Sequence, residues 1–206
     1  AGLFLLILLA CQAAIFQAVR QFASEADTEQ AIRLSNRRLF SQARTRAQSA
    51  ASAYPYNGYA LFQLGVTDFA TGTAPNHQQR AQESLLRAAP YMPHLPNLLR
   101  LLGQTHYHLK QYTESAATLD RYFRLDPKPR TTADYLHQVR GMAHFRTGRQ
   151  GAAAVPLTVA ASFPEQRLEL VVPRLLNAIV LQQPESGQAL LRATLFEHPD
   201  RSLSSQ

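Results

Sequence analysis

The sequence predicts an all-α protein, in which a single N-terminal transmembrane helix precedes an α-solenoid of about four helix pairs and a degenerate C-terminal cap. Three observations support this prediction. The first nineteen of the 206 residues carry no charged side chain. Three glycines recur 38 residues apart, and a pattern of small residues followed by proline recurs beside them. The chain therefore divides into a transmembrane helix at 1–22, a helical repeat domain at 23–199 and a frayed tail at 200–206.

The composition fits one sizeable soluble domain with a basic surface. Hydrophobic residues make up 46% of the chain, and 21 Lys and Arg against 14 Asp and Glu give a net charge of +7. The basic residues are scattered singly, apart from one cluster at Arg33, Arg37, Arg38, Arg44 and Arg46. Because no block of like charge marks a nucleic-acid arm, we expect no nucleic-acid binding.

The apolar segment from Ala1 to Val19 has the length of a membrane span. Nineteen helical residues cover roughly 28 Å, close to the thickness of a bilayer core, and Arg20 follows where the interface would begin. We expect residues 1–19 to contact the lipid bilayer. A cleaved signal peptide is an alternative, although the segment has no basic start. A lipoprotein signal is another, because residues 8–11 resemble a lipobox ending in Cys11, but the apolar stretch continues beyond it.

Two uncharged polar residues, Gln12 and Gln17, lie inside this span. In lipid such side chains gain from hydrogen bonds to another helix, so we expect them either to dock on a larger membrane protein or to reach water near the interface. The basic residues follow the span, from Arg20 onward, which favours a cytoplasmic repeat domain unless a basic stretch precedes Ala1. The arrangement predicts a single-pass protein of a bacterial inner membrane.

The repeat is anchored by the glycines Gly65, Gly103 and Gly141, which are 38 residues apart. Each is followed three and four residues later by a polar residue and an aromatic one, as in Asp68-Phe69 and His106-Tyr107. A second half-motif places small, apolar and small or aromatic residues before a proline. Its four copies are Ala43, Ala47, Ala50, Pro55; Ala81, Leu85, Ala88, Pro93; Ser115, Leu119, Tyr122, Pro127; and Ala153, Leu157, Ala160, Pro164.

This pattern resembles the tetratricopeptide repeat, in which small residues let helix A and helix B of each pair approach closely and proline ends helix B. The best copy covers 98–127. The chain departs from the family pattern in having no tryptophan, in a longer turn at 73–79 and in Pro156, which we expect to kink the fourth helix B. The first helix A is weak, and we expect the transmembrane helix to run on through Gln30. Residues 167–199 resemble a degenerate fifth repeat that caps the array.

The resemblance implies a concave groove lined by helix A positions, suited to an extended or helical segment of another protein. Carried over residue by residue, the groove consists of Tyr59, Phe62, Gln63, Val66 and Phe69 in the second repeat; Arg100, Gln104, Tyr107 and His108 in the third; and Tyr135, Gln138, Met142, Phe145 and Arg146 in the fourth. Aromatic residues at helical spacing also pack inside such arrays, so each of these positions is either a contact or a core residue.

Catalytic and metal-binding motifs are absent from the sequence. It contains no Gly-rich phosphate loop, no GxSxG elbow and no HExxH. The single cysteine, Cys11, allows no intramolecular disulfide. His106 and His108 are two residues apart, so on a helix they point to different faces and do not share a metal ion. We expect no catalytic activity, no metal and no cofactor.

The sequence thus predicts a membrane-anchored scaffold for protein–protein interaction, an accessory subunit that docks on and stabilises a complex of multispan membrane proteins. The alternative is a periplasmic tail or accessory of an envelope polysaccharide or assembly enzyme. An anchored chaperone for cytochromes or outer-membrane components differs from the first hypothesis mainly in binding transiently. Mapping the native N-terminus separates the first two, because hundreds of upstream residues with further spans would favour the enzyme tail.

Overall fold

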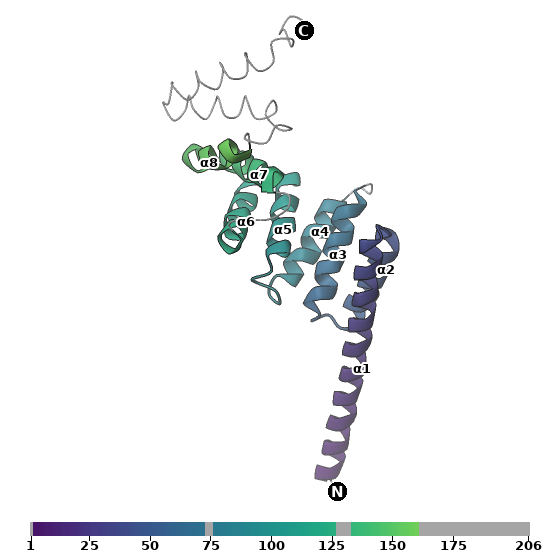
Figure 1. Ribbon diagram of the computed structural model, residues 1–206. Helices are drawn as coiled ribbons and strands as arrows, with labels where there is room; N and C mark the ends of the chain where they lie inside the picture. The colour runs from purple at the N-terminus through teal and green to yellow at the C-terminus, as the bar shows by residue number, and fades with distance from the viewer. Residues whose placement is uncertain (1, 73–75, 127–132, 161–206) are drawn as a thin grey trace, which may run out of the picture. The chain divides into compact units, whose positions relative to one another are not determined.

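The computed structural model describes residues 2–72, 76–126 and 133–160, and every regular element in these ranges is an α-helix (Figure 1). The chain forms two compact units, Ala1–Thr105 and His106–Gln206, and each is described by itself. The helices are α1 Gly2–Asn36, α2 Phe40–Ala53, α3 Gly58–Thr71, α4 His77–Ala88, α5 Pro96–His108, α6 Tyr112–Leu125, α7 Ala133–Arg146 and α8 Gln150–Ala160. The predicted fifth repeat at 167–199 and the tail at 200–206 lie outside the described residues.

Helix α1 is one continuous helix of 35 residues, which confirms that the apolar segment runs on into helix A of the first repeat. Its N-terminal half projects beyond the helices of the same unit (Figure 1). It is long and apolar enough to cross a membrane, a property that it shares with a signal sequence near an N-terminus. The exposed large apolar side chains on this half are Phe4, Leu6, Ile7, Leu8, Leu9, Ile15, Phe16, Val19 and Phe22.

The first two helix pairs pack through small residues. Ala31 of α1 and Ala47 of α2 are fully buried and form one cluster with Leu64 of α3. In the second pair a Cβ added to Gly65 of α3 would lie 2.6 Å from Cγ of Leu85, so only glycine leaves room for this buried leucine of α4. The predicted close approach of helix A and helix B is therefore present in this unit.

The same contact recurs between α7 and α8 in the second unit. A Cβ on Gly141 would lie 2.7 Å from Cγ of Leu157 and 3.1 Å from its backbone nitrogen. Leu157 forms a buried cluster with Ala153 and Ala160, the other two residues of the predicted half-motif. Helix α8 runs through Pro156, so the proline does not end the helix there.

The turns from helix A to helix B share a left-handed residue. Arg38, Gly72, Lys110 and Gly148 all have φ between 52° and 74°. The residue that follows Arg38, Lys110 or Gly148 donates its backbone amide to the carbonyl five residues earlier. One example is the hydrogen bond from Arg149 to His144, at 2.9 Å, and such bonds cap the C-terminus of helix A. Part of the longer turn predicted at 73–79 is helical instead, because residues 77–79 form the start of α4.

Replacing Gly141 by alanine tests the close approach of α7 and α8. We expect Gly141→Ala to lower the free energy of unfolding by about 1–3 kcal/mol, because the new methyl group overlaps Leu157. Gly151→Ala is the matched control: its Cβ would meet nothing within 4 Å, so alanine should be neutral or stabilise by up to about 1 kcal/mol. Chemical denaturation of the full chain in detergent, followed by circular dichroism, measures both. Equal stabilities for the two variants would contradict the packing described here.

Candidate partner-binding groove

A hollow of about 450 Å³ lies between α1 and α3, the first two A helices, and is called the α1–α3 hollow below. One face of α1 supplies Gln21, Glu25, Glu29 and Ile32, which recur every three or four residues. The opposite wall consists of Tyr54, Tyr56, Asn57, Gly58 and Tyr59, from the α2–α3 loop and the start of α3. The hollow therefore joins two carboxylates to three tyrosines.

Asn57 fixes the geometry of this hollow. Its side-chain oxygen accepts a hydrogen bond from the backbone amide of Ala60 at 3.1 Å, which caps the N-terminus of α3. Its Nδ2 donates to the hydroxyls of Ser24 at 2.9 Å and Thr28 at 3.2 Å, both buried on α1. Ser24 in turn donates to the carbonyl of Ala50 on α2 at 2.8 Å. This network joins α1, α2 and α3 beside the hollow.

Of the groove positions predicted in the first unit, Tyr59 is exposed and lines the hollow. Gln63, Val66, Phe69 and Arg100 are half-buried. Phe62, which is 9% exposed, and Gln104 are buried, so the structure places their side chains in the interior rather than on an open surface. The face of α1 was absent from the prediction, although its spacing was readable once helix A was continued through Gln30.

In the second unit the predicted positions Tyr107, Tyr135 and Arg146 lie close enough to interact. Burial raises the pKa of Tyr107, and nearby Tyr112 and Tyr135 raise it further while Arg146 opposes them. Burial also raises the pKa of Tyr135. The Tyr107 ring meets the Tyr112 ring edge to face, with centroids 5.6 Å apart. Because their pKa values are raised, Tyr107 and Tyr135 stay neutral phenols near physiological pH.

The remaining positions of the second unit divide between core and surface. Met142 and Phe145 are half-buried and pack against the cluster of Ala153, Leu157 and Ala160. Gln138 is half-buried, whereas His108 is exposed, as is Arg146. Gln12 and Gln17, the predicted membrane contacts, are both exposed on α1.

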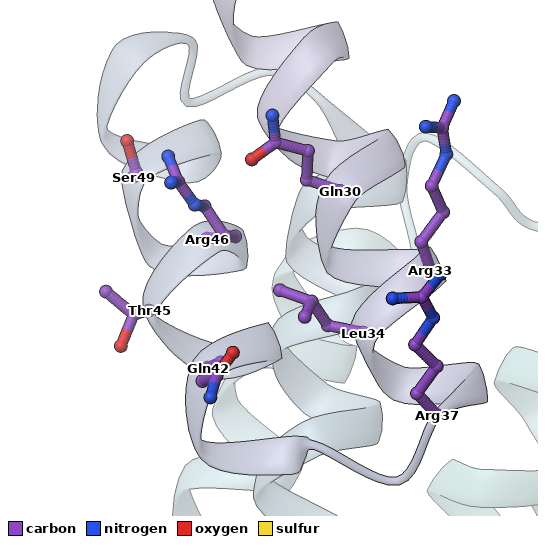
Figure 2. A pocket seen from close by; sticks show the side chains of 8 residues that line it. All are labelled: Gln30, Arg33, Leu34, Arg37, Gln42, Thr45, Arg46 and Ser49. Carbon is purple, nitrogen blue, oxygen red and sulfur yellow. The ribbon is translucent and has the colours of Figure 1, made fainter.

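A second recess, of about 680 Å³, lies between α1 and α2 (Figure 2). Its arginines are largely engaged within the protein. Arg33 pairs with Glu29 one turn earlier, and Arg46 pairs with Asp27, Nη1 to Oδ1, at 3.2 Å. Its lining residues are Gln30, Arg33, Leu34, Arg37, Gln42, Thr45, Arg46 and Ser49. This mixed polar lining makes it a weaker candidate for a partner than the α1–α3 hollow.

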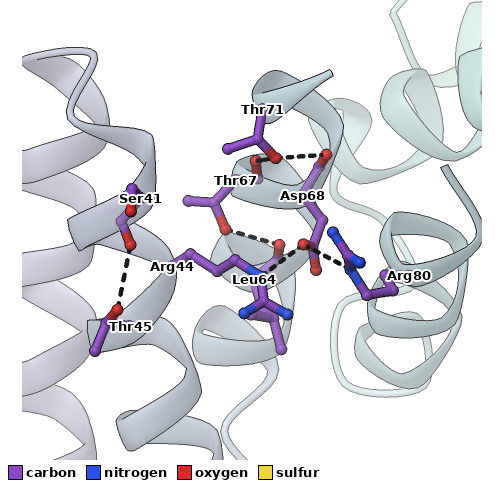
Figure 3. A network of polar contacts seen from close by, with 8 residues as sticks. All are labelled: Ser41, Arg44, Thr45, Leu64, Thr67, Asp68, Thr71 and Arg80. Carbon is purple, nitrogen blue, oxygen red and sulfur yellow. Dashed lines mark hydrogen bonds and ion pairs between the residues drawn. The ribbon is translucent and has the colours of Figure 1, made fainter. Parts of the chain in front are cut away.

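A buried carboxylate links the first two repeats. Asp68 of α3 is 1% exposed, and its Oδ1 accepts from Nε of Arg44 on α2 at 2.7 Å and from Nε of Arg80 on α4 at 3.2 Å (Figure 3). A buried carboxylate is stable only where such partners replace its hydration. Asp68 therefore holds α3 against helices on both sides and has a structural role.

A comparable link joins α6 to α7 in the second unit. Oδ1 of Asp120 accepts from Nε of Arg140 at 2.7 Å and lies 3.1 Å from Nε2 of the buried His144. Burial alone would raise the pKa of Asp120, but the hydrogen bonds to His144 and Arg140 outweigh it and lower this pKa below its ordinary value. Within the described residues no three His, Cys, Asp or Glu side chains are placed to hold a metal ion.

No protein-family model and no curated protein matches the chain. Solved structures do. A structure of MamA from AMB-1 superposes with a TM-score of 0.70 at 15% identity, covering 88% of this chain and 95% of that one. YrrB, described as a TPR protein with an unusual peptide-binding site, gives 0.70 at 14% identity, covering 85% and 86%. MamA from MSR-1 gives 0.66 at 16% identity, covering 88% and 99%.

The chain has a tetratricopeptide-repeat fold. At these identities the likeness shows the fold alone, and it agrees with the helix pairs and close approaches described above. Within the tetratricopeptide array, α1, α3, α5 and α7 are the A helices, and the α1–α3 hollow lies between two consecutive ones. Of the groove positions that the sequence resemblance implied, Tyr59 lines this hollow.

Two substitutions of Asn57 separate its roles as helix cap and as bridge. We expect Asn57→Ala to cost about 2 kcal/mol of unfolding free energy, because it removes the cap and leaves buried hydroxyls with fewer partners. Asn57→Asp keeps an oxygen for the cap but loses the donor to Ser24 and Thr28, so its cost should be smaller. Thermal and denaturant unfolding of the full chain measure both. An Asn57→Ala variant as stable as the parent would exclude the bridging role.

The interactions of Asp120 with Arg140 and His144 should make the free energy of unfolding depend on pH. Because the pKa of Asp120 is lowered by folding, its contribution is present above the unfolded pKa near 3.8 and is lost as pH falls through the lower folded value. We expect Asp120→Asn to cost about 1 kcal/mol at pH 7, a size set by its partial exposure. The difference from the parent should shrink below about pH 4. Unfolding curves at several pH values measure this, and a difference that stays constant down to pH 2 would contradict the ion-pair explanation.

Proposed function

We propose that the chain is a membrane-anchored scaffold for protein–protein interaction, an accessory subunit that docks on and stabilises a complex of multispan membrane proteins. The observation that carries this proposal is the α1–α3 hollow, which shares helix α1 with the apolar segment. A partner bound in the hollow would therefore contact the same helix that enters the bilayer. The peptide-binding site named for YrrB shows that this fold is used to hold peptides elsewhere.

The lining of the hollow indicates the chemistry of the partner segment. Tyr59 offers a ring face for apolar side chains and a hydroxyl group for backbone contacts of the partner. Glu25 lies exposed on the facing wall, where it would attract a basic side chain, whereas Glu29 beside it already pairs with Arg33. We expect a segment of another membrane protein that combines aromatic or aliphatic residues with Lys or Arg.

Catalysis has no comparable support within the described residues. The buried Asp68 and His144 and the half-buried Asp120 are engaged in hydrogen bonds or ion pairs that link neighbouring helices. They hold the array together, and the open hollow is lined by tyrosines and surface carboxylates. The geometry therefore favours a binding module over an enzyme.

Native mass spectrometry of the tagged chain, extracted from its own membranes in mild detergent, tests the scaffold. We expect a complex with multispan proteins in fixed ratio. Tyr59→Ala should weaken the affinity for the partner about tenfold and so lower its occupancy, because a packed aromatic contact contributes on the order of 1.4 kcal/mol or more. Leu86→Ala is the matched control, since Leu86 is exposed on α4 and does not line the hollow. Recovery of the chain alone, or equal occupancy for the two variants, would contradict the proposal.

A further inference from the structure

The α2–α3 loop lies against the end of the apolar segment of α1. A recess of about 350 Å³ separates Ala13, Phe16, Gln17 and Arg20 of α1 from residues 54–56 of the loop. Arg20 closes the contact: its Nε donates to the carbonyl of Ala53 at 2.8 Å and its Nη2 to that of Ser52 at 3.3 Å. These bonds place the C-terminus of α2 level with the first charged residue of α1.

Three tyrosines lie together at this level, and they are called the tyrosine edge below: Tyr54, Tyr56 and Tyr91. The rings of Tyr54 and Tyr56 meet edge to face with centroids 5.7 Å apart, and those of Tyr56 and Tyr91 with centroids 6.4 Å apart. A Cβ on Gly58 would lie 2.7 Å from that of Tyr91, so the α2–α3 and α4–α5 loops touch. Tyr56 is nevertheless 63% exposed and Tyr91 48% exposed.

The two ends of the first repeats differ in charge. The loops of the tyrosine edge, residues 54–57 and 89–95, contain no Asp, Glu, Lys or Arg. The α1–α2 turn, at the opposite end of the first helix pair, carries Arg37 and Arg38. It lies roughly 24 Å along α1 from Arg20, from sixteen residues at 1.5 Å each. Uncharged, exposed tyrosines beside an apolar helix are the side chains that are enriched where a membrane meets water.

We propose that the tyrosine edge lies in the headgroup region of the bilayer that α1 crosses, so that the α2–α3 and α4–α5 loops hold the helices of the first unit upright on the membrane. This rests on the membrane anchoring in the proposed function. Continuity with the exposed apolar side chains of α1, among them Phe16, Val19 and Phe22, identifies lipid as the occupant of this surface. Arg20 lies at the same level, where its guanidinium meets α2 carbonyls and remains near lipid phosphates.

The absence of tryptophan from the chain allows a direct test. Single tryptophans are introduced by Tyr56→Trp and Tyr91→Trp, and each full chain is reconstituted in phosphatidylcholine vesicles whose lipids are brominated either near the carbonyl end or deep in the acyl chain. Bromine quenches tryptophan at close range. Leu39→Trp is the matched control, because Leu39 is 42% exposed and lies in the distant α1–α2 turn. Leu8→Trp, on the exposed apolar half of α1, reports the anchoring itself.

We expect shallow bromine to quench the fluorescence at positions 56 and 91 at least twofold more than that at position 39, and deep bromine to quench position 8. A different result would be quenching at position 8 but quenching at positions 56 and 91 no stronger than that of Leu39→Trp. It would overturn the proposed headgroup position of the tyrosine edge, leave the anchor intact and point to a protein as the occupant of this surface. No quenching at position 8 would overturn the anchor in the proposed function, and the tyrosine edge with it.

Discussion

The close approach of an A helix to its B helix, present in the pairs α1–α2, α3–α4 and α7–α8, is the constraint on which the stacking of these helices depends. Gly65 faces Leu85 and Gly141 faces Leu157, and in both cases a single methyl group would overlap a buried leucine. In the first pair, two small buried residues, Ala31 of α1 and Ala47 of α2, allow the same close approach. A helix pair that cannot approach this closely leaves its leucine half-exposed and cannot present a flat face to the next pair. The close approach within a pair therefore allows consecutive pairs to stack. A groove along the A helices can form only where the pairs stack.

Hydrogen bonds between polar side chains join consecutive helix pairs. They fix how one pair is positioned along the next, which apolar contacts alone do not determine. Arg44 bonds to Asp68 and Asp120 to His144, and each pair is 24 residues apart in the chain. The positions correspond under the 38-residue repeat, yet the acid lies on helix A in one case and on helix B in the other. Both repeats therefore have a hydrogen bond between helices at these positions, but the acidic and basic residues have changed places.

The sequence was sufficient to predict the helices and their pairing, because the glycines and the small-residue half-motif encode a local steric requirement. The left-handed turns were not predicted from the sequence: Gly72 and Gly148 occupy two of them, but Arg38 and Lys110 occupy the others. The roles of Asp68 and His144 were not predictable, although Asp68 was noted beside the central glycine of its repeat. Their partners lie 24 residues away, and such a partner is recognised only when the packing brings the two helices together.

The groove was harder to predict. The position of a residue along a helix determines which way its side chain points, but it does not determine how deeply the side chain is buried. Phe62 and Tyr59 are three residues apart on α3, yet the first is buried and the second lines the hollow. The prediction also omitted the wall made by α1, because an apolar segment of membrane length was assigned to the bilayer as far as residue 22. The helix has no break there, and its polar face begins within the same turn.

In the proposed membrane anchoring, this continuity limits how the helices of the first unit can move relative to the bilayer. A loop between span and domain would let the repeats tilt and rotate, whereas α1 carries the helix geometry unbroken from the apolar segment to Asn36. Arg20 and Asn57 then tie that helix to α2 and α3 on two sides. Rotation of α1 in the bilayer would therefore turn the α1–α3 hollow with it. A partner that packs against the apolar half of α1 and also fills the hollow would gain from both contacts without a further ordering cost in a linker, which is the advantage of preorganisation in binding.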